Sequence, residues 1–452
     1  MYSEFTKRVH SLTDRPEPRE HLVLGHTVLH GQMRADQPVL LPHAERPEHI
    51  AILGKTGTGK SSLLRFLCEQ DIRDNRGFVF FDLHGDATSA LARLIAAEEQ
   101  RRGESLAHRL VVFDPSDREY SVGINVLEAE DPQSAYVQLA EITQILRDRW
   151  RLEAFGARTE ELLRNSLQVL AENRMTIVEL GPLLTNPSFR AALVEQTKSA
   201  EPRVYFTERY SRLSPAGQAE YREAVLNKVT VFTADPHFRH LLGQTDSSLN
   251  LRGMIDAGSW LVFNLDKGQL GEQAVTLGSL LLTRLKHTLF GRKSSELVTV
   301  YCDELQNLVT LERGIDTLFA EARKLGVSIT SANQYLDQYP PSMQAAVMAV
   351  GTLCFFQLSG FDAKRVGDAH GHDAVLAQQL RDLPSRQMIV MRPPLPPAYA
   401  GVPNLTDLSA DPTELLHRSR LIWATRRDHI EEEITLRLGA DLSLVDPLVG
   451  WE

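Results

Sequence analysis

Short apolar runs alternate with longer amphipathic stretches over the first 130 residues of the chain. The apolar runs at residues 49–53, 77–82 and 110–114 have the length of buried strands, and the last two end in an aspartate. The stretches between them have the apolar spacing of helices that pack on one face. This alternation is typical of βαβ units, so it predicts an α/β fold with a central, mostly parallel sheet.

The pattern changes between residues 131 and 244, where strand-like runs are nearly absent. Leu163, Leu167 and Leu170 follow one another at helical spacing, which places them on one face of a helix. The segment is far longer than an ordinary loop. It predicts an all-α domain inserted into the sheet domain.

Strand-like runs return after residue 244, and a proline-rich stretch at 393–397 ends them. Two shorter runs near the N-terminus, at 21–25 and 37–41, predict a small β-rich segment. The later strands are predicted at 259–265, 297–302, 327–332, 352–358 and 388–391. The predicted domains are an N-terminal arm and β-rich segment at 1–45, a sheet domain at 46–130 and 245–400, the all-α domain at 131–244, and a helical tail at 401–452.

A glycine-rich turn lies between the first predicted strand of the sheet domain and the following helix. Residues 54–61 read Gly-Lys-Thr-Gly-Thr-Gly-Lys-Ser, the pattern of a phosphate-binding P-loop, also called Walker A. Such glycines let successive N–H groups point at phosphate oxygens, and the helix N-terminus adds partial positive charge. Lys60 would reach the β and γ phosphates, and Ser61 would ligate Mg²⁺. The predicted cofactors are therefore ATP and Mg²⁺, and the predicted nucleotide-binding residues are Gly54, Lys55, Thr56, Gly57, Thr58, Gly59, Lys60, Ser61 and Ser62.

Two acids follow the strand predicted at 297–302, which is the Walker B arrangement. Asp303 is predicted to hold Mg²⁺, and Glu304 is predicted to polarise the attacking water. Gln334, at the end of the next strand, is a candidate sensor of the γ-phosphate, and an amide that satisfies a turn is the alternative. Arg323 is a candidate arginine finger for a neighbouring subunit, and an exposed helix arginine is the alternative.

Three weaker clusters contain residues that bind metals or nucleic acids in other proteins. The clusters are Asp82, His84 and Asp86; the histidine pairs His237/His240 and His370/His372; and Arg147, Arg149 and Arg151 around Trp150. Turn chemistry is favoured for the first cluster, because it follows a strand and contains Gly85. The histidine pairs lack a carboxylate or thiol framework, so structural or exposed roles are favoured. For the arginines a solvated helix face is favoured over a nucleic-acid contact.

Composition narrows the class of protein. A chain of 452 residues predicts two or three domains, and its net charge of −10 means that any DNA contact must be local. Cys68, Cys302 and Cys354 lie in apolar segments without paired spacing, as expected for reduced thiols. The sequence has neither an apolar run of membrane-spanning length nor a secretion signal. We therefore expect a cytoplasmic protein without direct membrane insertion, and recruitment to the inner membrane by a partner is an alternative.

The order and spacing of the two Walker motifs and several further segments resemble the HerA/FtsK superfamily of ring-shaped DNA-pumping ATPases. Within it, residues 21–400 look most like the cytosolic part of conjugative type IV secretion coupling proteins. Membrane-anchored members carry N-terminal transmembrane helices that this sequence lacks. The segments that carry the resemblance are residues 80–86, 123–127, 161–165, 226–228, 235–244, 263–268, 303–307, 321–326 and 332–336.

The resemblance implies a RecA-like domain and a homohexameric ring with ATP at the subunit interfaces. The predicted function is an ATP-hydrolysing DNA translocase that moves DNA through a central channel, with a membrane or DNA-processing protein as partner. The alternative is a scaffold ATPase that binds protein partners through its helical domain without pumping DNA. A metabolic kinase is disfavoured, because no compact acceptor site is visible in the sequence.

Overall fold

The computed structural model describes residues 19–129, 135–152, 156–309, 319, 321–371, 373–405 and 408–439. These residues belong to two compact units. The first unit lies within Met1–Val112, Leu251–Gly268 and Thr288–Ile422, and the second lies within Phe113–Asn250, Gln269–His287 and Trp423–Glu452.

The first unit is built on an 11-stranded sheet with the order β2-β1-β12-β11-β10-β3-β9-β8-β4-β7-β5. From β10 to β7 the neighbouring strands pair in parallel, whereas β11, β12, β1 and β2 extend the sheet by antiparallel pairing. The strands are β1 (His21–Leu29), β2 (Gln32–Pro42), β3 (Ile50–Leu53), β4 (Phe78–Asp82), β5 (Leu110–Phe113), β7 (Trp260–Asn264), β8 (Val298–Asp303), β9 (Val327–Asn333), β10 (Thr352–Phe355), β11 (Gln387–Met391) and β12 (Ala398–Gly401). The predicted α/β class with a mostly parallel sheet is confirmed.

Two features of the sheet differ from what the sequence indicates. The N-terminal strands β1 and β2 belong to the main sheet, because β1 pairs with β12 and β2 pairs with β1. Strand β12 was not predicted, since its sequence Ala-Tyr-Ala-Gly carries little apolar signal. It becomes a strand by pairing with β11 after the proline-rich turn.

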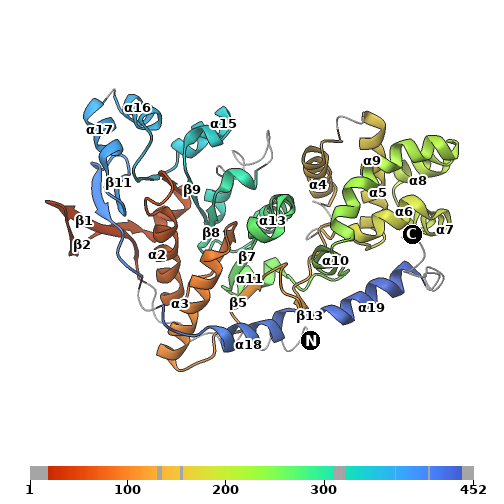
Figure 1. Ribbon diagram of the computed structural model, residues 1–452, viewed down its shortest axis with the longest axis horizontal. Helices are drawn as coiled ribbons and strands as arrows, with labels where there is room; N and C mark the ends of the chain where they lie inside the picture. The colour runs from red at the N-terminus through yellow and green to blue at the C-terminus, as the bar shows by residue number, and fades with distance from the viewer. Residues whose placement is uncertain are drawn as a thin grey trace, which may run out of the picture. The chain divides into compact units, whose positions relative to one another are not determined.

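Helices α2 and α3 run side by side across the parallel part of the sheet (Figure 1). Helix α2 buries Leu63, Leu64 and Leu67 in the main core, and α3 packs on β4 and β7. The other helices whose residues lie wholly or almost wholly in this unit are short. The helices are η1 (His43–Glu48), α2 (Lys60–Arg73), α3 (Asp86–Arg102), α11 (Leu251–Asp256), η5 (Leu305–Asn307), η6 (Arg323–Leu325), η7 (Leu336–Gln338), α15 (Pro341–Met348), α16 (Gly360–Ala369), α17 (Ala374–Asp382) and α18 (Thr413–Trp423).

The second unit is helical over most of its described residues. Three of its helices begin at a capping residue followed by proline: Asn186 before α7, Ser214 before α9 and Asp235 before α10. Each capping side chain accepts a hydrogen bond from the first turn, and proline suits the first helical position. Leu163, Leu167 and Leu170 are fully buried on α5, which confirms the face predicted from their spacing.

The elements of the second unit also include one short antiparallel strand pair, β6 with β13. Helices α12 (Lys267–Leu270) and α13 (Glu272–Phe290) contain residues of both units. The others are β6 (Tyr120–Ser121), α4 (Ala135–Trp150), α5 (Ala157–Glu172), η3 (Ile177–Glu179), α6 (Leu180–Thr185), α7 (Pro187–Gln196), α8 (Ala200–Val204), η4 (Tyr205–Tyr210), α9 (Pro215–Thr233), α10 (Pro236–Leu242), β13 (Thr425–Arg426) and α19 (Arg427–Leu438).

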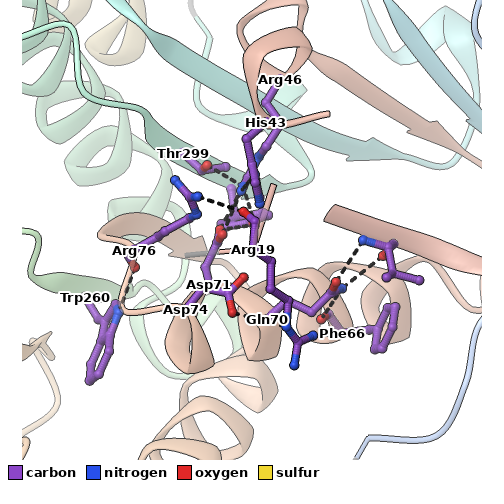
Figure 2. Close-up of polar contacts among 12 residues, drawn as sticks. Arg19, His43, Arg46, Phe66, Gln70, Asp71, Asp74, Arg76, Trp260 and Thr299 are labelled. Atoms are coloured by element: carbon purple, nitrogen blue, oxygen red, sulfur yellow. Dashed lines mark hydrogen bonds and ion pairs between the residues drawn. The ribbon is translucent and has the colours of Figure 1, made fainter. Parts of the chain in front are cut away.

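A buried ion pair ties the C-terminal end of α2 to η1 and β8 (Figure 2). Arg46 donates to both carboxylate oxygens of Asp71, at 2.7 and 2.8 Å, and also to Thr299 and Tyr301 of β8. The Tyr301 hydroxyl donates in turn to Asp71 at 2.6 Å. Burial lowers the pKa of the neighbouring His43 to about 3, and Arg46 adds to this effect, so His43 is neutral. The network fixes α2 relative to β8.

The same end of α2 also anchors β1 and β7 (Figure 2). The Gln70 side chain exchanges two hydrogen bonds with the backbone of Val23, and the Trp260 indole donates to the Arg76 carbonyl oxygen at 2.9 Å. The three cysteines are buried and free. Among the described helices, none is long and apolar enough to cross a lipid bilayer.

Candidate nucleotide-binding site

The sequence motifs of the sheet domain meet at the carboxyl edge of the parallel strands. The P-loop follows β3, and Asp303 ends β8. Strand β9 lies between β3 and β8, so Asn333 and Gln334 at its tip lie between the P-loop and the two acids. Ligands of open parallel sheets bind at this edge, and this order therefore defines one candidate site.

The P-loop backbone adopts the tight turn that its glycines allow. Gly57 and Gly59 have φ angles of 77° and 118°, in the region that side chains other than glycine disfavour. A Cβ atom on Gly54 would lie 2.5 Å from the Cβ of Phe356, so only glycine fits there. The Lys60 ammonium donates to the carbonyl oxygens of Gly54 and Lys55, at 2.7 and 3.0 Å. The loop thus holds its lysine inside the turn.

The residues predicted to hold Mg²⁺ contact each other directly. The Ser61 hydroxyl donates to Asp303 Oδ2 at 2.9 Å. Burial raises the pKa of Asp303, against the effects of Ser61 and Lys60, and burial also lowers the pKa of Lys60. A hydroxyl and a buried carboxylate side by side are oxygen ligands suited to Mg²⁺, and the glycine turn at the N-terminus of α2 fits a phosphate group. The donor set therefore fits a magnesium–nucleotide complex.

Glu304 has an unusual backbone conformation, and its carboxylate accepts hydrogen bonds from two amide side chains. Its φ and ψ angles are 60° and 49°, the left-handed region. Its Oε1 accepts from Gln334 Nε2 at 3.1 Å, and its Oε2 accepts from Asn307 Nδ2 at 2.8 Å. The structure thus brings together Lys60, Ser61, Asp303, Glu304 and Gln334, all of which the sequence identified as candidates.

His84 joins the same site, although the sequence indicated only a turn for it. The turn itself exists, because Asp82 accepts hydrogen bonds from the N–H groups of His84, Gly85 and Thr88 and from the Thr88 hydroxyl. His84 Nε2 lies 3.5 Å from Glu304 Oε1. The hydrogen bond to Glu304 is the main cause that raises the pKa of His84 to about 9, and it lowers the pKa of Glu304. This contact arises because β4 lies beside β8 in the sheet, and the sequence does not give that order.

A second contact that the sequence did not indicate supports the P-loop from the antiparallel side of the sheet. The Arg386 N–H donates to the Thr58 carbonyl oxygen at 2.7 Å, and the Ser385 hydroxyl donates to the Gly57 carbonyl oxygen at 3.3 Å. Arg386 has a φ angle of 64°, which is rare for arginine. No local sequence pattern marks this turn, because its partner lies in the P-loop.

Arg323 lies apart from these residues. It begins η6, just before β9, so it is at the amino edge of the sheet. Its guanidinium donates to Glu48 at 2.7 Å, and the side chain is largely exposed. The structure therefore does not bring Arg323 to the site of its own chain, and a role in a neighbouring subunit's site stays a prediction.

The weaker clusters show ordinary polar pairing. His237 contacts Asp235, and His240 contacts Glu431. Across the described ranges no group of histidine, cysteine and acidic side chains is arranged to hold a metal, and His372 lies outside those ranges. Trp150 is buried, and Arg149 donates to Ser279, so these two residues do not belong to a solvated helix face. Arg147 is partly exposed and Arg151 is exposed, so the expected solvated face is found in part.

A cavity of about 510 Å³ opens beside the P-loop and Gln334. Tyr335 and Phe361 line it with their rings well exposed. The remaining lining residues are Lys55, Thr56, Asp337, Ser359 and Asp362. The cavity is continuous with the candidate nucleotide site, since Lys55, Thr56 and Gln334 belong to both.

The chain matches the family model "Helicase HerA, central domain" over residues 28–283, more than half of its length. The chain therefore belongs to the HerA helicase central-domain family, and the resemblance to the HerA/FtsK superfamily is confirmed. No curated protein matches the chain by sequence.

Several solved structures share the fold. The bacterial conjugative coupling protein TrwBdeltaN70 is 16% identical, with a TM-score of 0.59 and coverage of 89% of this chain and 93% of its own. Plasmid coupling protein TrwB in complex with ADP and Mg²⁺ is 17% identical, with a TM-score of 0.58 and coverage of 88% and 97%. VirB4 of Thermoanaerobacter pseudethanolicus is 14% identical, with a TM-score of 0.58 and coverage of 85% and 97%. At these identities the similarity shows the fold.

Proposed function

We propose that the protein is an ATP-hydrolysing DNA translocase that works as a hexameric ring. The observation that carries the proposal is the meeting of Lys60, Ser61, Asp303, Glu304 and Gln334 at one edge of the sheet. Membership of the HerA helicase family supports a role on DNA, and the similar protein TrwB binds ADP and Mg²⁺ in its own structure.

Each side chain of the site has a distinct task in this proposal. Lys60 exchanges its two carbonyl partners for phosphate oxygens and neutralises their charge. Ser61 and Asp303 are placed to hold Mg²⁺, which when bound would neutralise charge that develops on the phosphates. Glu304 accepts the proton of the attacking water, and Gln334 moves its amide from Glu304 to the γ-phosphate. Lys60→Ala should therefore lose tight ATP binding, measured by titration with a labelled nucleotide.

The experiment that tests the DNA part measures the ATPase rate with and without DNA. Net charge is −10, so lysines and arginines that contact DNA must be concentrated in a small region. Binding should weaken steeply as salt rises and should show little sequence preference. If DNA neither binds at low salt with an ATP analogue nor stimulates hydrolysis, the translocase proposal fails.

Arg323 offers a test of the ring. Its exposed position and its pairing with Glu48, which is itself partly exposed, leave it available to another subunit. Arg323→Ala should slow hydrolysis and leave ATP affinity nearly unchanged. Mixing Arg323→Ala subunits with Glu304→Gln subunits should restore partial activity, because some interfaces then pair an intact arginine with an intact base. If no mixing ratio recovers activity, Arg323 does not act across the interface.

A scaffold ATPase is the second candidate, and a feature of the helical unit favours it. A cavity of about 880 Å³ there is lined by Leu127, Leu139 and Met175 together with Glu128 and Glu172, a mixture that suits a protein segment. Under this alternative the ATPase rate would not respond to DNA. The same rate measurement therefore separates the two candidates.

A further inference from the structure

The carboxylate of Glu304 is held by side chains from three separate segments. Gln334 follows β9, Asn307 ends η5, and His84 lies in the loop between β4 and α3. Gln334 and His84 share Oε1, at 3.1 and 3.5 Å, while Asn307 donates to Oε2 at 2.8 Å. Both oxygens of the proposed base therefore already accept a hydrogen bond, and Oε1 also lies in ion-pair contact with His84.

The backbone of Glu304 is also restrained. A left-handed conformation at a glutamate costs free energy and persists only where the surroundings enforce it. The Glu304 N–H donates to the Ala332 carbonyl oxygen at 2.9 Å, and Asp303 beside it ends β8. The surrounding residues therefore hold the Glu304 backbone in a conformation that it would not adopt by itself, and this sets the direction of the carboxylate.

These contacts compete with the task of a general base. A carboxylate that accepts hydrogen bonds at both oxygens is less basic and has less room to accept a proton from water. The Gln334 amide donates one of its two N–H groups to Glu304, and that N–H cannot donate to a γ-phosphate at the same time. The amide therefore has two alternative partners, and its transfer to phosphate would remove one of the restraints on Glu304.

We propose that His84, Gln334 and Asn307 form a latch that holds Glu304 in a resting position, and that His84 is the positioning residue that sets the basal rate of ATP hydrolysis. This inference rests on the proposed ATPase function. The His84 ring is half-exposed, whereas the backbone N–H of His84 donates to Asp82 at 3.2 Å. The ring can therefore leave Glu304 by side-chain rotation alone, without breaking the turn.

The test compares His84→Ala with the wild-type protein as full chains, with ATP and Mg²⁺ and without DNA. Removing the latch contact should raise kcat about fivefold, the factor that corresponds to an exposed ion pair at the upper end of its usual range. KM should stay the same, since His84 contacts the base and not the nucleotide loop. His84→Gln keeps an N–H donor without the charge and should fall between the two. An unchanged or lower kcat in His84→Ala would overturn the latch.

Two controls separate the latch from general effects of losing a histidine. His429 on α19 is a matched residue, because its Nε2 lies 3.5 Å from Glu433 Oε1 on an exposed surface. His429→Ala should leave kcat unchanged, and a rise equal to that of His84→Ala would contradict the proposal. The double variant His84→Ala with Glu304→Gln should be inactive. Raised activity in the double variant would mean that another base acts, and the latch would fall.

A third measurement does not depend on hydrolysis. In protein labelled with ¹⁵N-histidine, the NMR signal of the His84 ring should move in Glu304→Gln and stay in place in His429→Ala. A signal that does not move in Glu304→Gln would overturn the contact itself. Conversely, if the signal moves but the wild-type protein hydrolyses no ATP with or without DNA, the proposed ATPase function is wrong, and with it the rate-setting role of His84.

Discussion

The Arg46–Asp71 network and the His84–Glu304 network lie at opposite ends of strand β8. At the amino end, Arg46 binds Thr299, Tyr301 and Asp71, and the Arg46 and Asp71 side chains are 0% and 1% exposed. At the carboxyl end, the His84 and Glu304 side chains are 51% and 14% exposed. Both networks join a cationic side chain to a carboxylate, and both connect β8 to a neighbouring segment of the chain. They differ mainly in burial.

Burial decides what each network can do. A charged pair without access to water has no alternative partners, so the Arg46 network can only hold η1, α2 and β8 together. A pair that is half in water can exchange its contacts for water or a phosphate group at little cost. The strand is therefore anchored at one end and adjustable at the other, where the proposed base lies. The following predictions test this difference.

The largest effect is expected for Glu304→Gln, which affects activity at the adjustable end. The amide cannot accept the proton of the attacking water, so kcat should fall by about 10²- to 10⁴-fold. ATP binding should remain, because Lys60 and Ser61 are intact. Stability should change little, since the glutamine oxygen can still accept one of the two amide hydrogen bonds, and Gln334 and Asn307 are both partly exposed to water. A variant that kept most of its ATPase rate would show that Glu304 is not the base.

The next effect is expected for Arg46→Ala, which affects stability at the anchored end. Removing the guanidinium leaves the Asp71 carboxylate buried without its main partner, and breaking a buried pair in this way costs about 3–5 kcal/mol. Chemical denaturation would measure the loss. The double variant Arg46→Met with Asp71→Leu removes both charges and should recover much of it. Equal losses in the single and double variants would show that the charge left unpaired is not the cause.

The sequence predicts the parts of the site that are local. The P-loop is eight consecutive residues, and Asp303 and Glu304 directly follow an apolar run. His84 could not be assigned this way, because its contact depends on β4 pairing with β8, with Phe81 opposite Cys302. Hydrophobic periodicity gives the strands and not their order in the sheet.

The same limit applies to parts of the fold. Arg46 is one arginine in a polar stretch, and no local pattern indicates that it is fully buried. Strand β12 has only four residues, Ala-Tyr-Ala-Gly, so it is its pairing with β11 and β1 that makes it a strand. By contrast, β3 and β4 are buried at every position and are apolar except for Asp82 at the end of β4, so their existence was predictable.

A smaller effect is expected from pH at the adjustable end. Glu304, with help from Asp303 and Asp86, raises the pKa of His84 to about 9, and Lys267 at the start of α12 acts on Glu304 as well. A raised pKa means that the ion pair is fully present below the ordinary value of 6.5 and is lost as pH rises through about 9. The basal rate of the wild-type protein should therefore rise several-fold across that interval, towards the rate of His84→Ala. His84→Ala itself should not show this rise in rate with pH. A rise of equal size in both proteins would mean that a group other than His84 causes it.

The smallest effect is expected for a pair with the geometry of Arg46–Asp71 but without its burial. Arg209 in the helical unit donates to both carboxylate oxygens of Glu161, at 2.5 and 2.8 Å, and its side chain is 59% exposed. Water replaces lost partners at such a site, so Arg209→Ala should leave the midpoint of chemical denaturation nearly unchanged. High salt should weaken what little the pair contributes, whereas it should not affect the Arg46 pair, because screening ions do not reach buried charges. If Arg209→Ala destabilised the protein as much as Arg46→Ala, bidentate geometry and not burial would determine the strength of these pairs.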